Sequence, residues 1–308
     1  MRKPLIILIL FGVGLALAFG LEGAGPGAAV PVGPELDFVA RRIVATAPSV
    51  VESLYAIGAG EHVVGVGDYC TWPPDAARKP RVGGDVNPNF ERIMALAPDL
   101  IVVQGRAENM AAFCRKFGIR LLRVEMFDLA SIYSGLRRLG AVTDREAEAD
   151  RLAARLRLGL AEVAARVAGL PRPRVFIALG HRAGSLRLVG SAGGKTFLSQ
   201  LVEVAGGENV LADLSEPYPQ VSKETLLRRR PEVILEFFPG RKPDAAERQA
   251  LMDDWRSLPS LPAVRDGRIY FLTDDYLLLP GPRVVESARR LAEVLHPEAM
   301  KREDGYAP

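Results

Sequence analysis

Aromatic and polar side chains occur together in the loops that follow strand-like apolar runs of this sequence. These loops are "GDYCTWPPDA", "GGDVNPN", "LGHRAGSLR", "EPYPQ" and "LTDDYLLLPGPR". The candidate ligand-binding residues in them are Tyr69, Trp72, Asp85, His181, Arg182, Tyr218, Asp275 and Tyr276. Rings offer stacking area and the polar groups direct hydrogen bonds, a combination that suits a large, flat or chelated ligand. Taken singly, each aromatic residue could equally be one that packs a turn.

His181 raises the separate question of metal coordination. It follows a strand-like run and could bind iron or cobalt as an axial ligand, which would make haem a candidate ligand with Tyr69 or Tyr218 opposite. A single histidine without a spaced partner is more typical of a hydrogen-bonding loop residue. We therefore expect no metal or cofactor intrinsic to the protein.

Cys70 and Cys114 are the only cysteines. In an exported protein they could form a disulfide, or they could be two buried thiols, because sequence does not reveal whether their Cα atoms come within bridging range. Two cysteines and three scattered histidines do not have the spacing of a zinc site.

Motifs of the common enzyme classes are missing from the sequence. It contains no G-x-S-x-G elbow and no H-E-x-x-H pair. The run "GSAGGKT", residues 190–196, lacks the first glycine that a P-loop needs. We expect a binding protein; a chelatase or hydrolase acting on a tetrapyrrole is the alternative from another class.

The elements that must position these loops alternate between strands and helices, which predicts parallel sheets covered by helices. The first predicted lobe spans residues 38–143 and the second spans residues 171–297, followed by a tail at 298–308. Residues 144–170 keep helical periodicity up to Pro171. We interpret this stretch as a helix that joins two lobes; a long surface helix of one domain is the alternative.

One pattern of about 15 residues occurs twice in the sequence. "NFERIMALAPDLIVV" and "SKETLLRRRPEVILE" align Glu91 with Glu224 and Pro98 with Pro231 at the same spacing. A second pair, "LYAIGAGEHVVGV" and "LVEVAGGENVLAD", aligns at a slightly different spacing, as insertions between duplicated lobes would produce. Two copies of a lobe-sized unit indicate a duplication rather than a solenoid of short repeats.

The N-terminus is typical of an exported protein. Residues 1–20 have a basic start, an apolar run and small residues before a cleavage point, which predicts a signal peptide; a retained membrane anchor is the alternative. Residues 21–37 form a Gly/Ala/Pro lead-in. The net charge of +3, from 40 basic and 37 acidic residues, gives no nucleic-acid footprint.

Three stretches resemble a known family: "RRIVATAPSVVESLYAIGAGEHVVGVGDYCTWPPDA", "NPNFERIMALAPDLIVV" and "EPYPQVSKETLLRRRPEVILE". They resemble the periplasmic binding proteins for vitamin B12 and ferric siderophores, the helical-backbone (class III) receptors of ABC importers. The resemblance covers residues 40–297. It implies an α/β fold of two Rossmann-like lobes with parallel sheets, joined by a single long α-helix, with a ligand held between lobes that move little.

The resemblance also implies roles for individual residues. Positions that match Tyr69, Tyr218 and 275–279 lie at the corrinoid in the vitamin B12 receptors, although Tyr218, Tyr276 and Asp85 stand where that receptor has tryptophans. Positions that match Glu91 and Glu224 dock onto arginines of a two-fold symmetric permease. A carboxylate on each pseudo-symmetric lobe fits such a partner, since arginine–carboxylate pairs fix orientation as well as adding energy.

The resemblance therefore implies a monomeric periplasmic receptor of an ABC importer. We expect a corrinoid as its ligand, then a ferric siderophore, with haem as the alternative.

Overall fold

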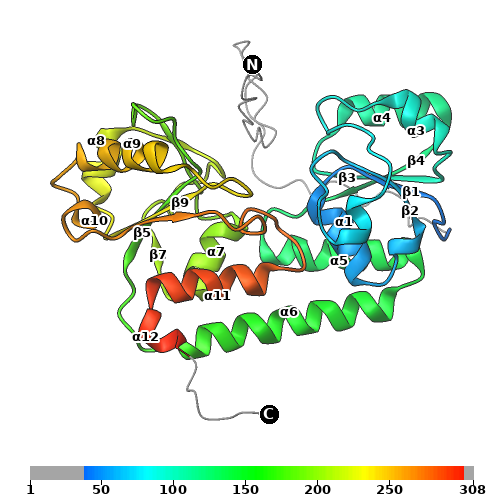
Figure 1. Ribbon diagram of the computed structural model, residues 1–308. Coiled ribbons are helices and arrows are strands. Elements are labelled where there is room, and N and C mark those ends of the chain that lie inside the picture. Colours follow the sequence, from blue (N-terminus) through cyan, green and yellow to red (C-terminus); the bar gives the residue numbers. More distant parts are fainter. Residues whose placement is uncertain (1–37, 302–308) are drawn as a thin grey trace.

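This structure is a computed structural model, and it describes residues 38–301. The predicted signal peptide (1–20), the lead-in (21–37) and most of the predicted tail lie outside the described residues. The chain forms two α/β lobes side by side, with one long helix running beneath both (Figure 1).

The first lobe is built on a four-stranded parallel sheet in the order β2-β1-β3-β4. Its strands are β1 (Ile43–Ala45), β2 (Val63–Val66), β3 (Leu100–Gln104) and β4 (Arg120–Val124). All of β1 and most of β3 are buried, as expected for strands covered on both faces by helices. The predicted alternation of strands and helices is present in this lobe.

Helices cover both faces of this sheet. They are α1 (Pro48–Ala56), α2 (Pro74–Ala77), α3 (Phe90–Ala95), α4 (Glu108–Phe117) and α5 (Leu129–Thr143), with a 3₁₀ turn at Gly60–His62. Helix α5 begins at a capping box in which Asp128 accepts from the Ser131 backbone and the Ser131 hydroxyl accepts from the Asp128 backbone. It ends where Asp144 takes a left-handed conformation, so the next helix starts in a new direction.

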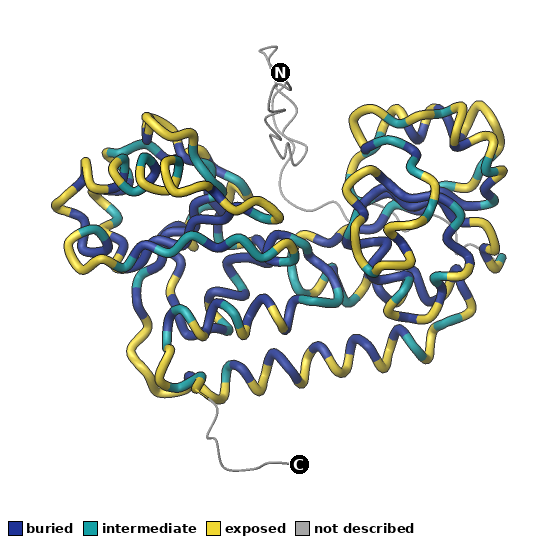
Figure 2. The backbone as a smooth tube through the Cα atoms, in the orientation of Figure 1, coloured by how far each residue is buried: buried dark blue, intermediate teal, exposed yellow. Residues whose placement is uncertain are grey.

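Helix α6 (Glu146–Arg166) is the long helix of Figure 1. Its 21 residues span about 32 Å at 1.5 Å per residue, shorter than the predicted 144–170. Its buried stripe includes Leu152, Leu156 and Val163, and Figure 2 shows buried positions alternating with exposed ones along it. It packs on α5 from the first lobe and on α7 and α11 from the second.

The second lobe repeats the topology of the first. Its parallel sheet has the order β10-β9-β5-β7, so that β7, β5, β9 and β10 correspond to β2, β1, β3 and β4. The strands are β5 (Arg174–Ala178), β7 (Glu208–Asn209), β9 (Val233–Phe237) and β10 (Ile269–Leu272). A separate antiparallel ribbon joins β6 (Val189–Gly190) to β8 (Gln220–Val221). The repeated strand order is what the sequence repeat predicts.

Six helices complete the second lobe. They are α7 (Phe197–Val204), α8 (Lys223–Arg229), α9 (Ala245–Arg256), α10 (Pro262–Arg265), α11 (Val284–Leu295) and α12 (Pro297–Met300). Thr196, Ser222 and Asp244 cap α7, α8 and α9 by accepting from backbone N–H groups. The expected fold class, two α/β lobes with parallel sheets, is confirmed.

One hydrophobic core runs through both lobes. It joins β1 and α1 of the first lobe to β5, α7 and α11 of the second by way of α5 and α6. Close packing of α11 on α6 depends on Gly159, because a Cβ there would lie 2.8 Å from Cγ1 of Val285. Each lobe also has one smaller hydrophobic cluster of its own, on its outer side. The lobes are therefore held together by apolar packing along α6 as well as by the chain.

The packing of α6 predicts a contrast between two of its leucines. Leu156 is 4% exposed and Leu158 is 66% exposed. We expect Leu156→Ala to lower the free energy of unfolding by about 2–5 kcal/mol, because it leaves a cavity in the shared core. Leu158→Ala, the matched control, is expected to change it by no more than about 0.5 kcal/mol. Urea denaturation measures both; equal effects would contradict the placement of this helix.

Candidate functional site

An ion pair between Glu52 and Arg283 joins the two lobes near the carboxyl ends of their strands. Glu52 lies on α1 of the first lobe, and Arg283 immediately precedes α11 of the second. Arg283 donates from Nε to Oε2 of Glu52 at 2.9 Å and from Nη2 to Oε1 at 2.5 Å. The two parallel bonds form the bidentate arrangement that arginine makes with carboxylates.

Three residues from the predicted ligand-binding set surround this ion pair. Arg283 donates from Nη1 to Oδ1 of Asp275 at 3.1 Å. Its guanidinium carbon lies 5.5 Å from the centre of the Trp72 ring and 5.2 Å from the centre of the Tyr276 ring, within cation–π range. We call Glu52, Trp72, Asp275, Tyr276 and Arg283 the interlobe cluster. The cluster combines aromatic surface with a charged centre.

Burial sets the electrostatics of the cluster. The Glu52 side chain is 3% exposed, and this burial raises the pKa of Glu52 despite the opposing charge and hydrogen bonds of Arg283. Burial alone would lower the pKa of Arg283, but the hydrogen bond and charge of Glu52, together with Asp275, raise it on balance. Removing Arg283 would leave the Glu52 carboxylate buried without its partner, and breaking a buried pair in this way typically costs about 3–5 kcal/mol.

Sequence reasoning missed both partners of this ion pair. Arg283 ends the quoted loop "LTDDYLLLPGPR", and Glu52 stands among apolar residues in "SVVESLYA". A carboxylate on the buried face of an amphipathic helix was the available signal, because such a group needs a partner. Nothing in the sequence points to Arg283 as that partner, 231 positions away.

The loop that carries Tyr69 and Trp72 is held by Arg81. The Arg81 guanidinium donates to the backbone carbonyls of Gly67 at 2.8 Å, Cys70 at 2.7 Å and Ala77 at 2.9 Å. Gly67 is required at the start of the loop, because a Cβ there would lie 2.0 Å from the carbonyl oxygen of Thr46. The aromatic side chains are left outward, with Tyr69 63% and Trp72 47% exposed.

The remaining predicted ligand residues lie outside the interlobe cluster. Asp85 is exposed next to Gly84, and Gly84 is close to the Tyr69 ring. Arg182 is exposed in the loop after β5. Tyr218 is half-buried in the loop before β8, and burial raises the pKa of its phenol. Asp85 and Tyr69 thus share one edge of the first lobe.

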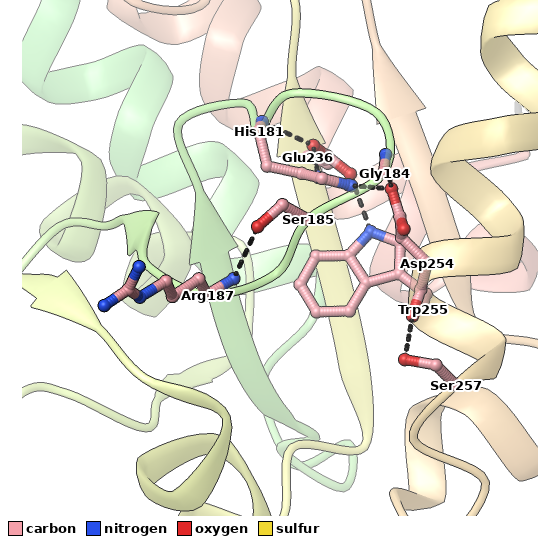
Figure 3. A network of polar contacts seen from close by, with 8 residues as sticks. All are labelled: His181, Gly184, Ser185, Arg187, Glu236, Asp254, Trp255 and Ser257. Carbon is pink, nitrogen blue, oxygen red and sulfur yellow. Dashed lines mark hydrogen bonds and ion pairs between the residues drawn. The ribbon is translucent and has the colours of Figure 1, made fainter.

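The prediction that His181 faces the ligand is wrong. Its side chain is fully buried, with Nδ1 2.6 Å from Oε1 of Glu236 and Nε2 3.2 Å from Oδ2 of Asp254. The Trp255 indole donates to the other oxygen of Glu236 at 2.7 Å and meets the imidazole edge-on. Figure 3 shows this network between the loop after β5 and α9. Both ring nitrogens have hydrogen-bond partners, so His181 is the hydrogen-bonding loop residue that the sequence favoured over an axial ligand.

The two cysteines are both free and buried. Cys70 belongs to the core that joins the lobes, and Cys114 belongs to the outer cluster of the first lobe. Burial raises the pKa of Cys70 to about 12 and that of Cys114 to about 11. Of the two alternatives left by the sequence, the structure has the unbridged thiols, and the disulfide is not formed.

Glu91 and Glu224 occupy matching positions in the two lobes. Each is exposed in the first turn of its helix, α3 or α8, after a capping Asn89 or Ser222. A hydrogen bond from Ser222 lowers the pKa of Glu224. Figure 1 places α3 and α8 on the same side of the molecule, away from α6. A hollow of about 570 Å³ lies beside Glu224, lined by residues 184–188 and 222–224.

Residues 38–301 contain neither a cluster of metal-binding side chains nor a membrane-spanning helix. No group of three or more His, Cys, Asp or Glu side chains there is arranged to hold a metal ion. No helix in this part of the chain has the length and apolar character needed to cross a bilayer.

Comparisons with known proteins agree on one family. The family model described as "Periplasmic binding protein" matches residues 43–276. A vitamin B12-binding protein from Salmonella typhimurium is 30% identical, covering 84% of this chain and 91% of the relative. An uncharacterised ABC transporter substrate-binding lipoprotein from Bacillus subtilis is 27% identical, covering 85% and 82%. The crystal structure of a periplasmic haem binding protein from Pseudomonas aeruginosa has a TM-score of 0.72 at 27% identity, covering 84% and 94%.

The His181 network predicts a pH-dependent stability. Burial alone would lower the pKa of His181, but Glu236 and Asp254 outweigh it and raise the pKa above 6.5. The stabilisation is therefore complete below the unfolded pKa of 6.5 and is lost as pH rises through the folded pKa. We expect the free energy of unfolding of the native protein, measured in urea, to fall relative to His181→Gln as pH rises above 6.5.

His62→Gln is the control for this experiment. It removes a buried histidine of the first lobe that lies outside the network, and so controls for the loss of a buried imidazole as such. A His181→Gln profile parallel to that of the native protein would show that the imidazole is not held in its charged form.

Proposed function

The chain belongs to the periplasmic binding protein family, and on that premise we propose that it is the substrate receptor of an ABC importer that captures a corrinoid between its lobes. The observation that carries this proposal is the interlobe cluster. It presents the Trp72 and Tyr276 rings from opposite lobes around one arginine. A flat ligand between the lobes would gain stacking area from both, and the polar groups would direct its edges.

A ligand that brings its own complete metal coordination fits this chemistry best. His181 has no nitrogen left for a metal. Burial raises the pKa of Tyr218 and of Tyr276, which favours neutral phenols over the phenolates that would bind Fe³⁺. Neutral phenols and indoles suit a corrinoid or a ferric siderophore, whose metal needs nothing from the protein. The vitamin B12-binding relative from Salmonella typhimurium supports the corrinoid.

Haem is the second candidate. The haem binding protein from Pseudomonas aeruginosa supports it, and Tyr69 is a largely exposed phenol that could reach a haem iron. An iron-bound tyrosinate gives a charge-transfer band that stacking does not, so the spectrum of the loaded protein separates the two ligands.

A receptor role also explains the paired glutamates. We expect Glu91 and Glu224 to dock onto arginines of the permease, one on each half of a symmetric partner. The hollow beside Glu224 offers space for a permease loop next to that carboxylate.

The protein would act as a monomer outside the cytoplasmic membrane, and it would return its ligand unchanged, unlike an enzyme. We propose that the signal peptide at residues 1–20 directs its export. Because the relative from Bacillus subtilis is a lipoprotein, membrane anchoring should be tested as well.

Ligand binding is tested by calorimetric titration with cyanocobalamin, a ferric siderophore and haemin. We expect cyanocobalamin to bind most tightly, and Trp72→Ala to weaken it about tenfold or more because one stacking surface is lost. Phe117→Ala is the matched control, since Phe117 has nearly the same exposure (46%) but lies on α4, outside the interlobe cluster. Failure of all three chelates to bind would refute the proposal, and a changed ligand on release would favour an enzyme.

Permease docking is tested with the double variant Glu91→Ala/Glu224→Ala. We expect its affinity for the chelate to be unchanged, while its stimulation of permease ATPase activity falls at least tenfold. Glu146→Ala/Glu286→Ala is the control, because both are exposed first-turn glutamates on other helices. If the control double variant lost as much ATPase stimulation as Glu91→Ala/Glu224→Ala, the loss would be an effect of general surface charge and the docking role would be contradicted.

A further inference from the structure

A hollow of about 980 Å³ lies at the amino-terminal edge of the second lobe's sheet. Its walls are the segments that lead into β5, β9 and β10, at residues 171–174, 228–232 and 265–268, with Leu295 and His296 beside them. Seven arginines line it, against two carboxylates, Glu232 and Asp266. We call it the arginine hollow.

The two carboxylates do not neutralise the hollow. Asp266 pairs with Arg265 at 2.8 Å, and Glu232 accepts from the backbone N–H of Arg174 at 2.9 Å. Arg229 is paired with Asp213 at 2.8 Å. Within residues 38–301, no carboxylate lies within 4.0 Å of the charged groups of Arg172, Arg228, Arg230 or Arg268. Four of the seven arginines thus line one space with no carboxylate within ion-pair distance.

Two of the arginines are held in place by the backbone. Arg174 donates from Nη2 to the carbonyl oxygen of Arg229 at 2.6 Å. Arg172 donates from Nη2 to the carbonyl oxygen of Gly207 at 2.8 Å. Because these bonds engage only one nitrogen of each guanidinium, the remaining N–H groups stay available for an anion. Fixed guanidinium groups lose less side-chain freedom when they bind.

The arginine hollow is separate from the interlobe cluster. The cluster forms after the strands end, whereas the hollow is formed before β5, β9 and β10 begin, at the opposite edge of the same sheet. Figure 1 shows α8 and α10, which border the hollow, at the end of the second lobe far from the first lobe. A ligand in the hollow would therefore leave chelate binding undisturbed.

We propose that the arginine hollow binds a phosphate-bearing anion. The paired N–H groups of a guanidinium match the oxygens of a phosphate in geometry. A phosphate group with two negative charges also balances the charge of several unpaired arginines better than a single carboxylate does. The volume falls in the range of small-molecule sites and exceeds what one phosphate fills, so the phosphate carries a substituent or a second phosphate. A free phosphate ester and a phospholipid headgroup share this chemistry.

Calorimetric titration of the full chain with pyrophosphate at low ionic strength tests the proposal. We expect binding that weakens with added salt and that falls at least tenfold in Arg230→Gln/Arg268→Gln. The control double variant, Arg155→Gln/Arg166→Gln, removes the same charge from the exposed face of α6 and should bind as the native protein does. Cyanocobalamin titrated in parallel should bind all three proteins equally.

Co-sedimentation with vesicles identifies the source of the phosphate. Phosphatidylglycerol vesicles are compared with phosphatidylcholine vesicles, again with both double variants. If the protein is retained on phosphatidylglycerol vesicles and only Arg230→Gln/Arg268→Gln reduces this retention, the hollow binds a lipid headgroup. If pyrophosphate binds but the vesicles do not retain the protein, the hollow binds a soluble phosphate. Absence of both, or equal losses in the two double variants, overturns the proposal.

Discussion

The ion pair between Glu52 and Arg283 is the interaction on which the arrangement of the two lobes depends. It links α1 of the first lobe to the residue that precedes α11 of the second, across 231 positions of the chain. A buried carboxylate without its arginine would be strongly unfavourable, so the pair has a stable geometry only when the lobes are close together. The pair also brings an aromatic ring of each lobe together, because Trp72 and Tyr276 both lie within cation–π range of the Arg283 guanidinium.

Apolar packing along α6 reinforces the same arrangement from the other side. The shared core passes from one lobe to the other through α5, α6, α7 and α11, and Gly159 allows α11 to approach α6 closely. A polar contact on one side of the molecule and a continuous core on the other leave little freedom for one lobe to swing against its neighbour. The match to the family model confirms the resemblance to periplasmic binding proteins, and lobes that move little remain an expectation drawn from that resemblance.

Much of the fold could be predicted because its strands and helices have local sequence signals, such as apolar runs and capping residues. The buried strands β3 and β9 are apolar except for Gln104 and Glu236, and α5 spans Leu129–Thr143 because Asp128 caps it and Asp144 ends it. The two-residue strands β6, β7 and β8 were not predicted, since elements so short have no period to detect. The predicted repeat has its counterpart in the strand order of the two sheets.

The site was only partly predictable, because its contacts join distant segments. Trp72, Asp275 and Tyr276 come together as loop residues of two parallel sheets should, but the arginine between them was not identified. His181 was misplaced for the same reason: its environment is made by Glu236 and Asp254 from other elements.

Arg81 has a consequence for how such a receptor could change its cargo over evolutionary time. Arg81 holds the loop by hydrogen bonds to main-chain oxygens alone. These bonds do not depend on which side chains stand at positions 69 and 72. New rings or polar groups could appear at the loop surface one at a time, without rebuilding the scaffold beneath. A family that diversified among differently shaped cargoes would benefit from recognition residues decoupled in this way from the anchor.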